Sequence, residues 1–115
     1  MWKPGRQRGG YEKITIFKSW RFLFDIHLLR IKEGAFVPPH KDEIHHMESI
    51  YEHHRCNIVI WAPDKGGRFI SDEDKRYFFG RVILFRPDIC NHRVTKVIKG
   101  KRIVLSIGWL RKANS

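Results

Sequence analysis

The stretch NHRVTKVIKGKRIVLSIGW, from Asn91 to Trp109, decides how the chain is expected to fold. Residues 93–98 alternate in polarity, residues 99–101 contain the turn glycine Gly100, and residues 102–110 form a longer apolar run. Alternation with a period of two is typical of a strand that covers a core with one face. The stretch therefore predicts two strands joined by a tight turn.

The same pattern of short apolar runs separated by turns extends from this point toward the N-terminus. Short runs rich in branched and aromatic residues alternate with turn signals such as Pro63–Gly67, and the pair Pro38-Pro39 forces an extended backbone into His40. The further expected strands are residues 13–17, 22–31, 55–62, 68–70 and 81–85. The run at 55–62 is apolar enough to be a strand buried on both faces. Many short strands with regularly spaced turns predict an all-β sandwich or barrel.

Length and composition bound the answer further. The chain has 115 residues, 42% hydrophobic and 13% aromatic, which predicts one folded domain and excludes a disordered polyelectrolyte. We expect residues 1–10 to be a flexible basic arm and residues 11–115 to be the domain. No apolar run is long enough to span a bilayer, and no secretory signal is visible. Two cysteines make no disulfide framework, so a cytoplasmic setting is expected, without a membrane.

The charge of the chain is strongly positive. The formal net charge is +11 and the sequence pI is about 10.1, so the surface attracts polyanions. Basic residues gather without nearby acids at Lys96, Lys99, Lys101, Arg111 and Lys112. Ordinary solvated charge is the favoured interpretation of these residues, and a cationic face that binds polyanions is the alternative.

One segment has helical character. In residues 43–54, Ile44, Met47 and Tyr51 fall on one stripe, which fits a short helix or an ordered loop. Four histidines lie in the same segment, at His45, His46, His53 and His54. Their spacing does not align them on a helix, so we expect a solvated segment or lid over the site, with a second metal site as the alternative.

His40, Asp42 and His92 carry the chemistry. On a strand, residues i and i+2 point to the same face, so the His40 imidazole and the Asp42 carboxylate project together. His92 opens a different strand fifty residues later. Two histidines and one carboxylate leave coordination positions open, which is the ligand set suited to a non-haem Fe(II) that binds substrate and O₂. Taken alone, His-x-Asp fits a pair of surface residues better, because a chain with seven histidines is expected to contain such pairs by chance.

Arg102 is the second half of this constellation. It shares one face of the last strand with Val104, Ser106 and Gly108, by the period of two. A guanidinium on an inward face is costly unless it meets an anion, and no acidic residue occurs between Arg93 and Lys112. A ligand carboxylate would satisfy it. The alternative is that Arg102 faces solvent beside Lys101.

The span from about Arg30 to Trp109 resembles the 2-oxoglutarate/Fe(II)-dependent oxygenases, nearest to their prolyl-4-hydroxylase-like branch. The matching pieces are RIKEGAFVPPHKD at 30–42, RCNIVIWAPDKGGRF at 55–69 and NHRVTKVIKGKRIVLSIGW at 91–109. The resemblance implies a double-stranded β-helix, a jelly-roll barrel, with at most a short helix or lid segment. It also implies a dioxygenase that hydroxylates a protein or peptide side chain and releases succinate and CO₂.

Residue by residue, the resemblance implies that His40, Asp42 and His92 bind Fe(II) and that Arg102 holds the distal carboxylate of 2-oxoglutarate. O₂ is the oxidant, and ascorbate is a further cofactor to test. Relatives often place a tyrosine near the position of Ile31 to grip the co-substrate, and that hydroxyl is missing here. The expected substitutes are Ser106 or Asn57.

Three other uses of these residues stay open. The same chemistry on a nucleobase or nucleic acid is favoured by the net charge of +11. A cupin-like metal-binding module that does not use 2-oxoglutarate is the non-enzymatic alternative. Cys56, Cys90, His54 and His92 could instead form a zinc site, although cysteines packed as small hydrophobic residues are the expected account.

Overall fold

The computed structural model describes residues 2–5, 8–19, 21, 23–41, 51–71, 76–78, 81–89 and 91–112, and every regular element among them is a β-strand. The larger sheet has the strand order β1-β2-β3-β12-β5-β9-β8. Its strands are β1 (Lys3–Pro4), β2 (Glu12–Ser19), β3 (Phe24–Ile31), β12 (Arg102–Lys112), β5 (Tyr51–Trp61), β9 (Val82–Phe85) and β8 (Arg76–Phe78).

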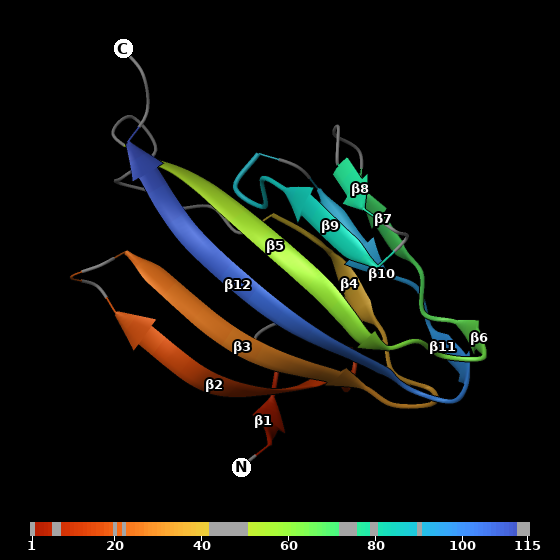
Figure 1. The fold of residues 1–115 in the computed structure, drawn as a ribbon. Coiled ribbons are helices and arrows are strands. Elements are labelled where there is room, and N and C mark those ends of the chain that lie inside the picture. The colour runs from red at the N-terminus through yellow and green to blue at the C-terminus, as the bar shows by residue number, and fades with distance from the viewer. Residues whose placement is uncertain are drawn as a thin grey trace.

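A smaller sheet lies against one half of the larger one (Figure 1). It has the order β4-β10-β7, formed by β4 (Val37–His40), β10 (His92–Val94) and β7 (Phe69–Ser71). A short pair, β11 (Val97–Lys99) and β6 (Lys65–Gly66), closes one end. Because each sheet presents one face to the other, the two together form a jelly-roll β-barrel.

Strand β12 organises the larger sheet. It pairs antiparallel with β3 from Arg102–Ile31 to Trp109–Phe24, and with β5 on its other edge. Burial alternates from Arg102 to Trp109, and the buried set begins at Arg102 and includes Ser106. The predicted two-residue period and the inward face are therefore confirmed.

The core lies between the two sheets. Ile31 of β3 and Ile83 of β9 are fully buried, and they pack in one cluster with Val37, Phe69 and Val94 of the smaller sheet. Branched and aromatic residues fill this space because they suit the pleated inner faces of both sheets. Several members of this core, among them Ile31, Phe69 and Phe85, also line a cavity together with polar side chains.

Strand β5 differs from the sequence expectation in two ways. Residues 51–54, expected in a helix or loop, are its first four residues, because Tyr51 pairs with Lys112 and His54 with Trp109. Long-range pairing with β12 overrides the local periodicity there. The strand is also not buried on both faces, since Ile60 is 53% exposed and Trp61 56% exposed. The rest of the expected helix, residues 43–50, lies outside the described residues.

The expected strand at 93–98 is wrong in its bounds. It is interrupted at Thr95 and Lys96, so that His92–Val94 joins the smaller sheet and Val97–Lys99 pairs with β6. The amide of Thr95 donates to the carbonyl of Arg68 at the break. Because of this interruption, residues 92–99 contribute strands to two different sheets.

The N-terminal residues contact the larger sheet. Lys3 and Pro4 pair with Lys13 and Glu12, and the Arg30 guanidinium lies 4.1 Å from the centre of the Trp2 ring. These contacts place residues 2–5 beside β2. Among the residues that the structure describes, no helix is long and apolar enough to cross a membrane.

Candidate active site

His40 and His92 face each other across neighbouring strands. They are direct partners in the antiparallel pairing of β4 with β10, and their ring centroids are 4.3 Å apart. His92 is buried, and the rings of Phe69 and Phe85 pack around it at centroid distances of 6.0 and 5.1 Å. The structure therefore brings together two imidazoles that are 52 residues apart in sequence, in largely apolar surroundings.

The backbone before His40 fixes its ring. The His40 Nδ1–H donates a hydrogen bond of 2.7 Å to the carbonyl of Pro38. With the proton held on Nδ1, the lone pair lies on Nε2, which is the tautomer that a metal ligand needs. The extended Pro38-Pro39 backbone makes this bond possible, because it turns the carbonyl toward the ring of the residue two positions on.

Asp42 lies outside the described residues, two positions beyond the end of β4. Within the described part of the chain, no cluster of three His, Cys, Asp or Glu side chains forms a metal site. The paired imidazoles and the His40 tautomer fit two nitrogen ligands of a metal ion. The carboxylate that would complete the set remains the prediction made for Asp42.

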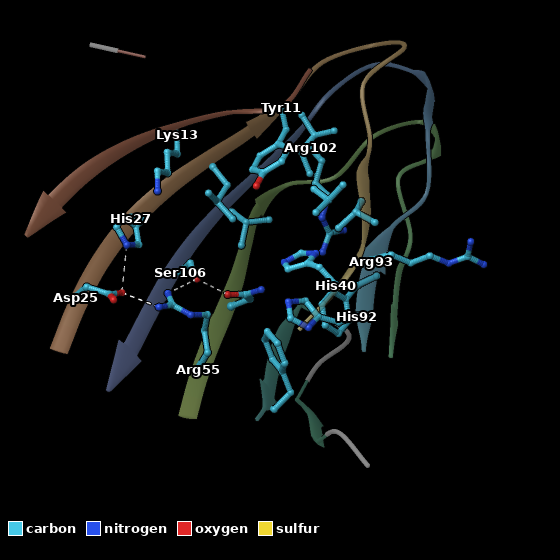
Figure 2. Close-up of a pocket in the computed structure, with 18 of the residues that line it drawn as sticks. Tyr11, Lys13, Asp25, His27, His40, Arg55, His92, Arg93, Arg102 and Ser106 are labelled. Atoms are coloured by element: carbon cyan, nitrogen blue, oxygen red, sulfur yellow. Dashed lines mark hydrogen bonds and ion pairs between the residues drawn. The ribbon is translucent and has the colours of Figure 1, made fainter. Parts of the chain in front are cut away.

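Arg102 is buried at the first position of β12, and only 7% of it is exposed. Its Nη1 donates to the carbonyl of Gly67 at 3.1 Å, and its side chain lies beside His40 at the wall of the cavity (Figure 2). The alternative that Arg102 faces solvent is wrong. The buried guanidinium therefore places positive charge at the wall of the cavity.

Ser106 and Asn57, both expected to contact the co-substrate, are hydrogen-bonded to each other. The Ser106 hydroxyl donates to Asn57 Oδ1 at 2.6 Å and accepts from Arg55 Nη1 at 2.8 Å. Since a hydroxyl has one proton, Ser106 can donate to a ligand only by releasing Asn57. The amide nitrogen is the donor that this pair offers to a ligand.

Arg55 links this pair to two residues that the sequence analysis missed. Its Nη2 donates to Asp25 Oδ1 at 2.8 Å, and His27 Nε2 lies 3.3 Å from the same oxygen. Burial raises the pKa of the Asp25 carboxyl, but hydrogen bonds from His27 and Arg55 and the Arg55 charge outweigh it and lower the pKa to about 2. The signal was present in the sequence, because Asp25 and His27 are polar residues at alternate positions of an apolar strand.

A cavity of about 440 Å³ connects these groups. The acidic lining residue among those described is Asp25, whereas five basic residues line it: Lys13, Lys18, Arg55, Arg93 and Arg102. Tyr11 is a further lining residue that sequence reasoning missed, and its hydroxyl points into the cavity on the side of Arg102 (Figure 2). The excess of cationic side chains suits a small anionic ligand.

The remaining histidines and cysteines do not assemble as the alternatives required. His53 lines the cavity, whereas His54 bonds Glu52 at 3.0 Å and stacks on Trp109 at 6.0 Å. His45, His46 and Cys90 lie outside the described residues. Cys56 is a free cysteine opposite Ile107, on the outer row of the sheet with His54. A zinc site that joins these two to the inward His92 is therefore not formed by the described residues.

Comparison with known proteins supports the fold. No protein-family model and no curated protein matches the sequence. A prolyl-4-hydroxylase of Pseudomonas putida superposes with a TM-score of 0.69 at 18% identity, over 98% of this chain and 78% of that chain. A viral collagen prolyl hydroxylase from Paramecium bursaria Chlorella virus-1, solved with 2OG, gives 0.63 at 16% identity, over 93% and 81%.

A cupin 2 conserved barrel domain protein from Salinispora arenicola is also similar, with a TM-score of 0.56 at 13% identity, over 90% of this chain and 79% of that chain. At these identities the likeness is one of fold. The predicted all-β, double-stranded β-helix class is confirmed.

Proposed function

We propose that this chain is a 2-oxoglutarate- and Fe(II)-dependent dioxygenase that hydroxylates a protein or peptide side chain. The observation that carries the proposal is the convergence of His40, His92 and buried Arg102 on one cationic cavity. The similarity of the fold to two prolyl hydroxylases, one of them solved with 2OG, supports the choice of reaction.

The residues have distinct roles in this proposal. His40, His92 and Asp42 would hold Fe(II), and bound Fe(II) with 2-oxoglutarate would supply the oxidation of a substrate C–H bond by O₂, with release of succinate and CO₂. Phe69 and Phe85 keep water from the buried side of His92. The Pro38 carbonyl holds the His40 proton on Nδ1, which leaves the lone pair of Nε2 available to the metal.

Arg102 would bind the distal carboxylate of 2-oxoglutarate. Its guanidinium is desolvated, so an ion pair there is stronger than one at the surface. Tyr11 supplies a hydroxyl on the same side of the cavity, although it comes from the segment before β2 rather than from the strand position of Ile31. The amide of Asn57 is a further donor. Orientation of the co-substrate is the protein's contribution to rate.

Co-substrate binding and turnover test this assignment separately. Purified protein with Fe(II) and 2-oxoglutarate under air is expected to release succinate, and Asp42→Ala is expected to abolish the release. Arg102→Met is expected to weaken 2-oxoglutarate binding on the order of 100-fold, measured by calorimetry under anaerobic conditions. Arg68→Met, which removes an exposed arginine, is the matched control. Unchanged affinity in Arg102→Met would remove the co-substrate assignment.

Two observations favour other outcomes of the same experiments. The cupin neighbour favours a metal-binding barrel without 2-oxoglutarate, for which the metal would bind but succinate would not appear. The net charge of +11 and the lysines of the cavity wall favour a nucleic-acid substrate. Salt-sensitive binding of oligonucleotides that also stimulates succinate release would select that substrate class.

A further inference from the structure

The outer face of the larger sheet carries a long apolar stripe. Along β12 the side chains that alternate with the cavity-facing row are Ile103, Leu105, Ile107 and Trp109, each partly exposed. No described strand lies in front of this face, which is turned toward the viewer in Figure 1. The face is therefore uncovered by the described part of the chain.

The stripe continues across the neighbouring strands. Leu105 is flanked by Leu28 of β3 and Ile58 of β5 in the pairing register, and Ile107 is flanked by Ile26 and by Cys56. At one end, a bulge between Ile103 and Val104 brings the strongly exposed Ile60 and Trp61 to the same surface. An apolar surface of this continuity marks an interaction site.

Charged residues stand at both ends of the stripe. Lys101 and Arg111 precede and follow the apolar row on β12, and both are exposed. The Lys101 ammonium lies 5.5 Å from the centre of the Trp61 ring. Glu52, the register partner of Arg111, also bonds His54 and Arg86, and Glu33 accepts from the amide of Gly100 beside Lys101. Lys112 at one end and Lys99 at the other are further exposed cations, so basic side chains outnumber acidic ones at both ends. The ends of the stripe are therefore cationic.

We propose that this outer face, defined by the β12 row Ile103–Trp109 with its cationic ends, docks an acidic amphipathic helix of a partner protein. A helix with one apolar face is the usual cover of a sheet. From Lys101 to Arg111 the strand spans roughly 33 Å, about the length of a 22-residue helix. Acidic residues at the ends of such a helix would meet Lys101 and Arg111. A second copy of the chain is disfavoured, because each copy carries +11.

Synthetic peptides test the proposal directly. The first probe is a helical peptide of about 20 residues with a leucine stripe and glutamates at both ends, and the second replaces those glutamates with lysines. We expect the glutamate peptide to bind and the lysine peptide not to bind, by calorimetry. Amide shifts in an NMR titration are expected at Leu105 and Ile107, and not in β10.

Charge-reversal variants define the ends of the face. Lys101→Glu combined with Arg111→Glu is expected to weaken the glutamate peptide about tenfold, as two partly exposed ion pairs are lost. Arg68→Glu combined with Arg93→Glu makes the same change in net charge on the smaller sheet, and it is expected to leave binding within about twofold. Circular dichroism checks that both variants fold.

Four results would overturn the proposal. These are equal binding of both peptides, no binding of either, and preference of the protein for vesicles of phosphatidylcholine with phosphatidylglycerol over the glutamate peptide. The fourth is a dimer in sedimentation velocity that Ile107→Glu dissociates, because the face would then be a self-association surface.

Discussion

At the scale of residues, the interior of the barrel is held together by one arginine. Arg55 reaches Asp25 on β3 and Ser106 on β12 with separate nitrogens, both at 2.8 Å. Ser106 and Asn57 are buried and Arg55 and Asp25 partly so, and removal of one partner leaves the others without the bonds that offset their burial. These residues set the shape of the cavity between the proposed metal and its open end.

Asp25→Asn tests the charge in this network. The pKa of Asp25 is about 2 in the folded state and 3.8 in its unperturbed state, so its charge stabilises the fold fully above about pH 4. That stabilisation, about 2 kcal/mol, is lost as the pH falls from about 4 to 2. The variant is expected to be less stable at pH 7 and to lose less stability over that acid range, by urea unfolding. Asp64→Asn, at an exposed turn, is the control, and equal acid profiles for the two variants would contradict the assignment.

Gly108→Ala tests whether the Arg55 guanidinium needs the space that the missing side chain of Gly108 leaves. An added Cβ at Gly108 would collide with Arg55 Nη2, so the guanidinium must shift away from Asp25. We expect a loss of about 1–3 kcal/mol in the free energy of unfolding. In an Arg55→Ala background the same substitution should cost little, because the clashing group is gone. An equal cost in both backgrounds would argue against this cause.

At the scale of elements, the turn between β6 and β7 contacts Arg102, the first residue of β12. Gly67 has φ +63°, and its carbonyl accepts from Arg102 while its amide donates to Lys96. An added Cβ would lie 2.9 Å from both Pro63 Cγ and Val97 Cγ2. The turn therefore positions the guanidinium through backbone geometry that only glycine adopts easily.

Gly67→Ala is expected to weaken 2-oxoglutarate binding as well as stability. Gly34→Ala is the matched control, because Gly34 has φ +85° but an added Cβ there meets no atom within 4 Å. The control should cost only backbone strain, about 1 kcal/mol, and should leave co-substrate affinity unchanged. If both variants lowered the affinity for 2-oxoglutarate equally, the result would contradict the role of the Gly67 turn in positioning Arg102.

At the scale of the whole molecule, the cavity lies between the two sheets and is lined by side chains of both. His40 and His92 belong to the smaller sheet, and Arg102 belongs to the larger sheet. A ligand set that spans both sheets ties them together, so metal and co-substrate binding should stabilise the entire fold.

Thermal unfolding checks this coupling. Fe(II) with 2-oxoglutarate under anaerobic conditions is expected to raise Tm, and at about 100 times the Kd the gain is about 2.7 kcal/mol. A chelator should remove the gain. His40→Ala combined with His92→Ala should abolish the response to the metal, whereas Arg93→Ala, which removes the exposed residue that follows His92, should retain it. A response that survives loss of both histidines would place the metal elsewhere.

The sequence by itself determined the strand content and the inward row of β12, because the two-residue period records which face is buried. It also singled out His40, His92 and Arg102, since each is a chemically distinctive residue at a strand end beside a turn. Its error at residues 51–54 arose because helical periodicity is local, whereas the pairing of Tyr51 with Lys112 is not.

Only the tertiary structure decided which side chains share the cavity. Tyr11, Asp25 and Arg55 come from three strands or their flanks, and no spacing in the chain records that these meet. The bonding of Ser106 to Asn57 was likewise set by the β12–β5 register rather than by either residue. Residues that are distant in sequence meet because their strands pair, and strands pair through backbone hydrogen bonds. The periodicity of the side chains records which face of a strand is buried, but it does not record which strand lies next to it.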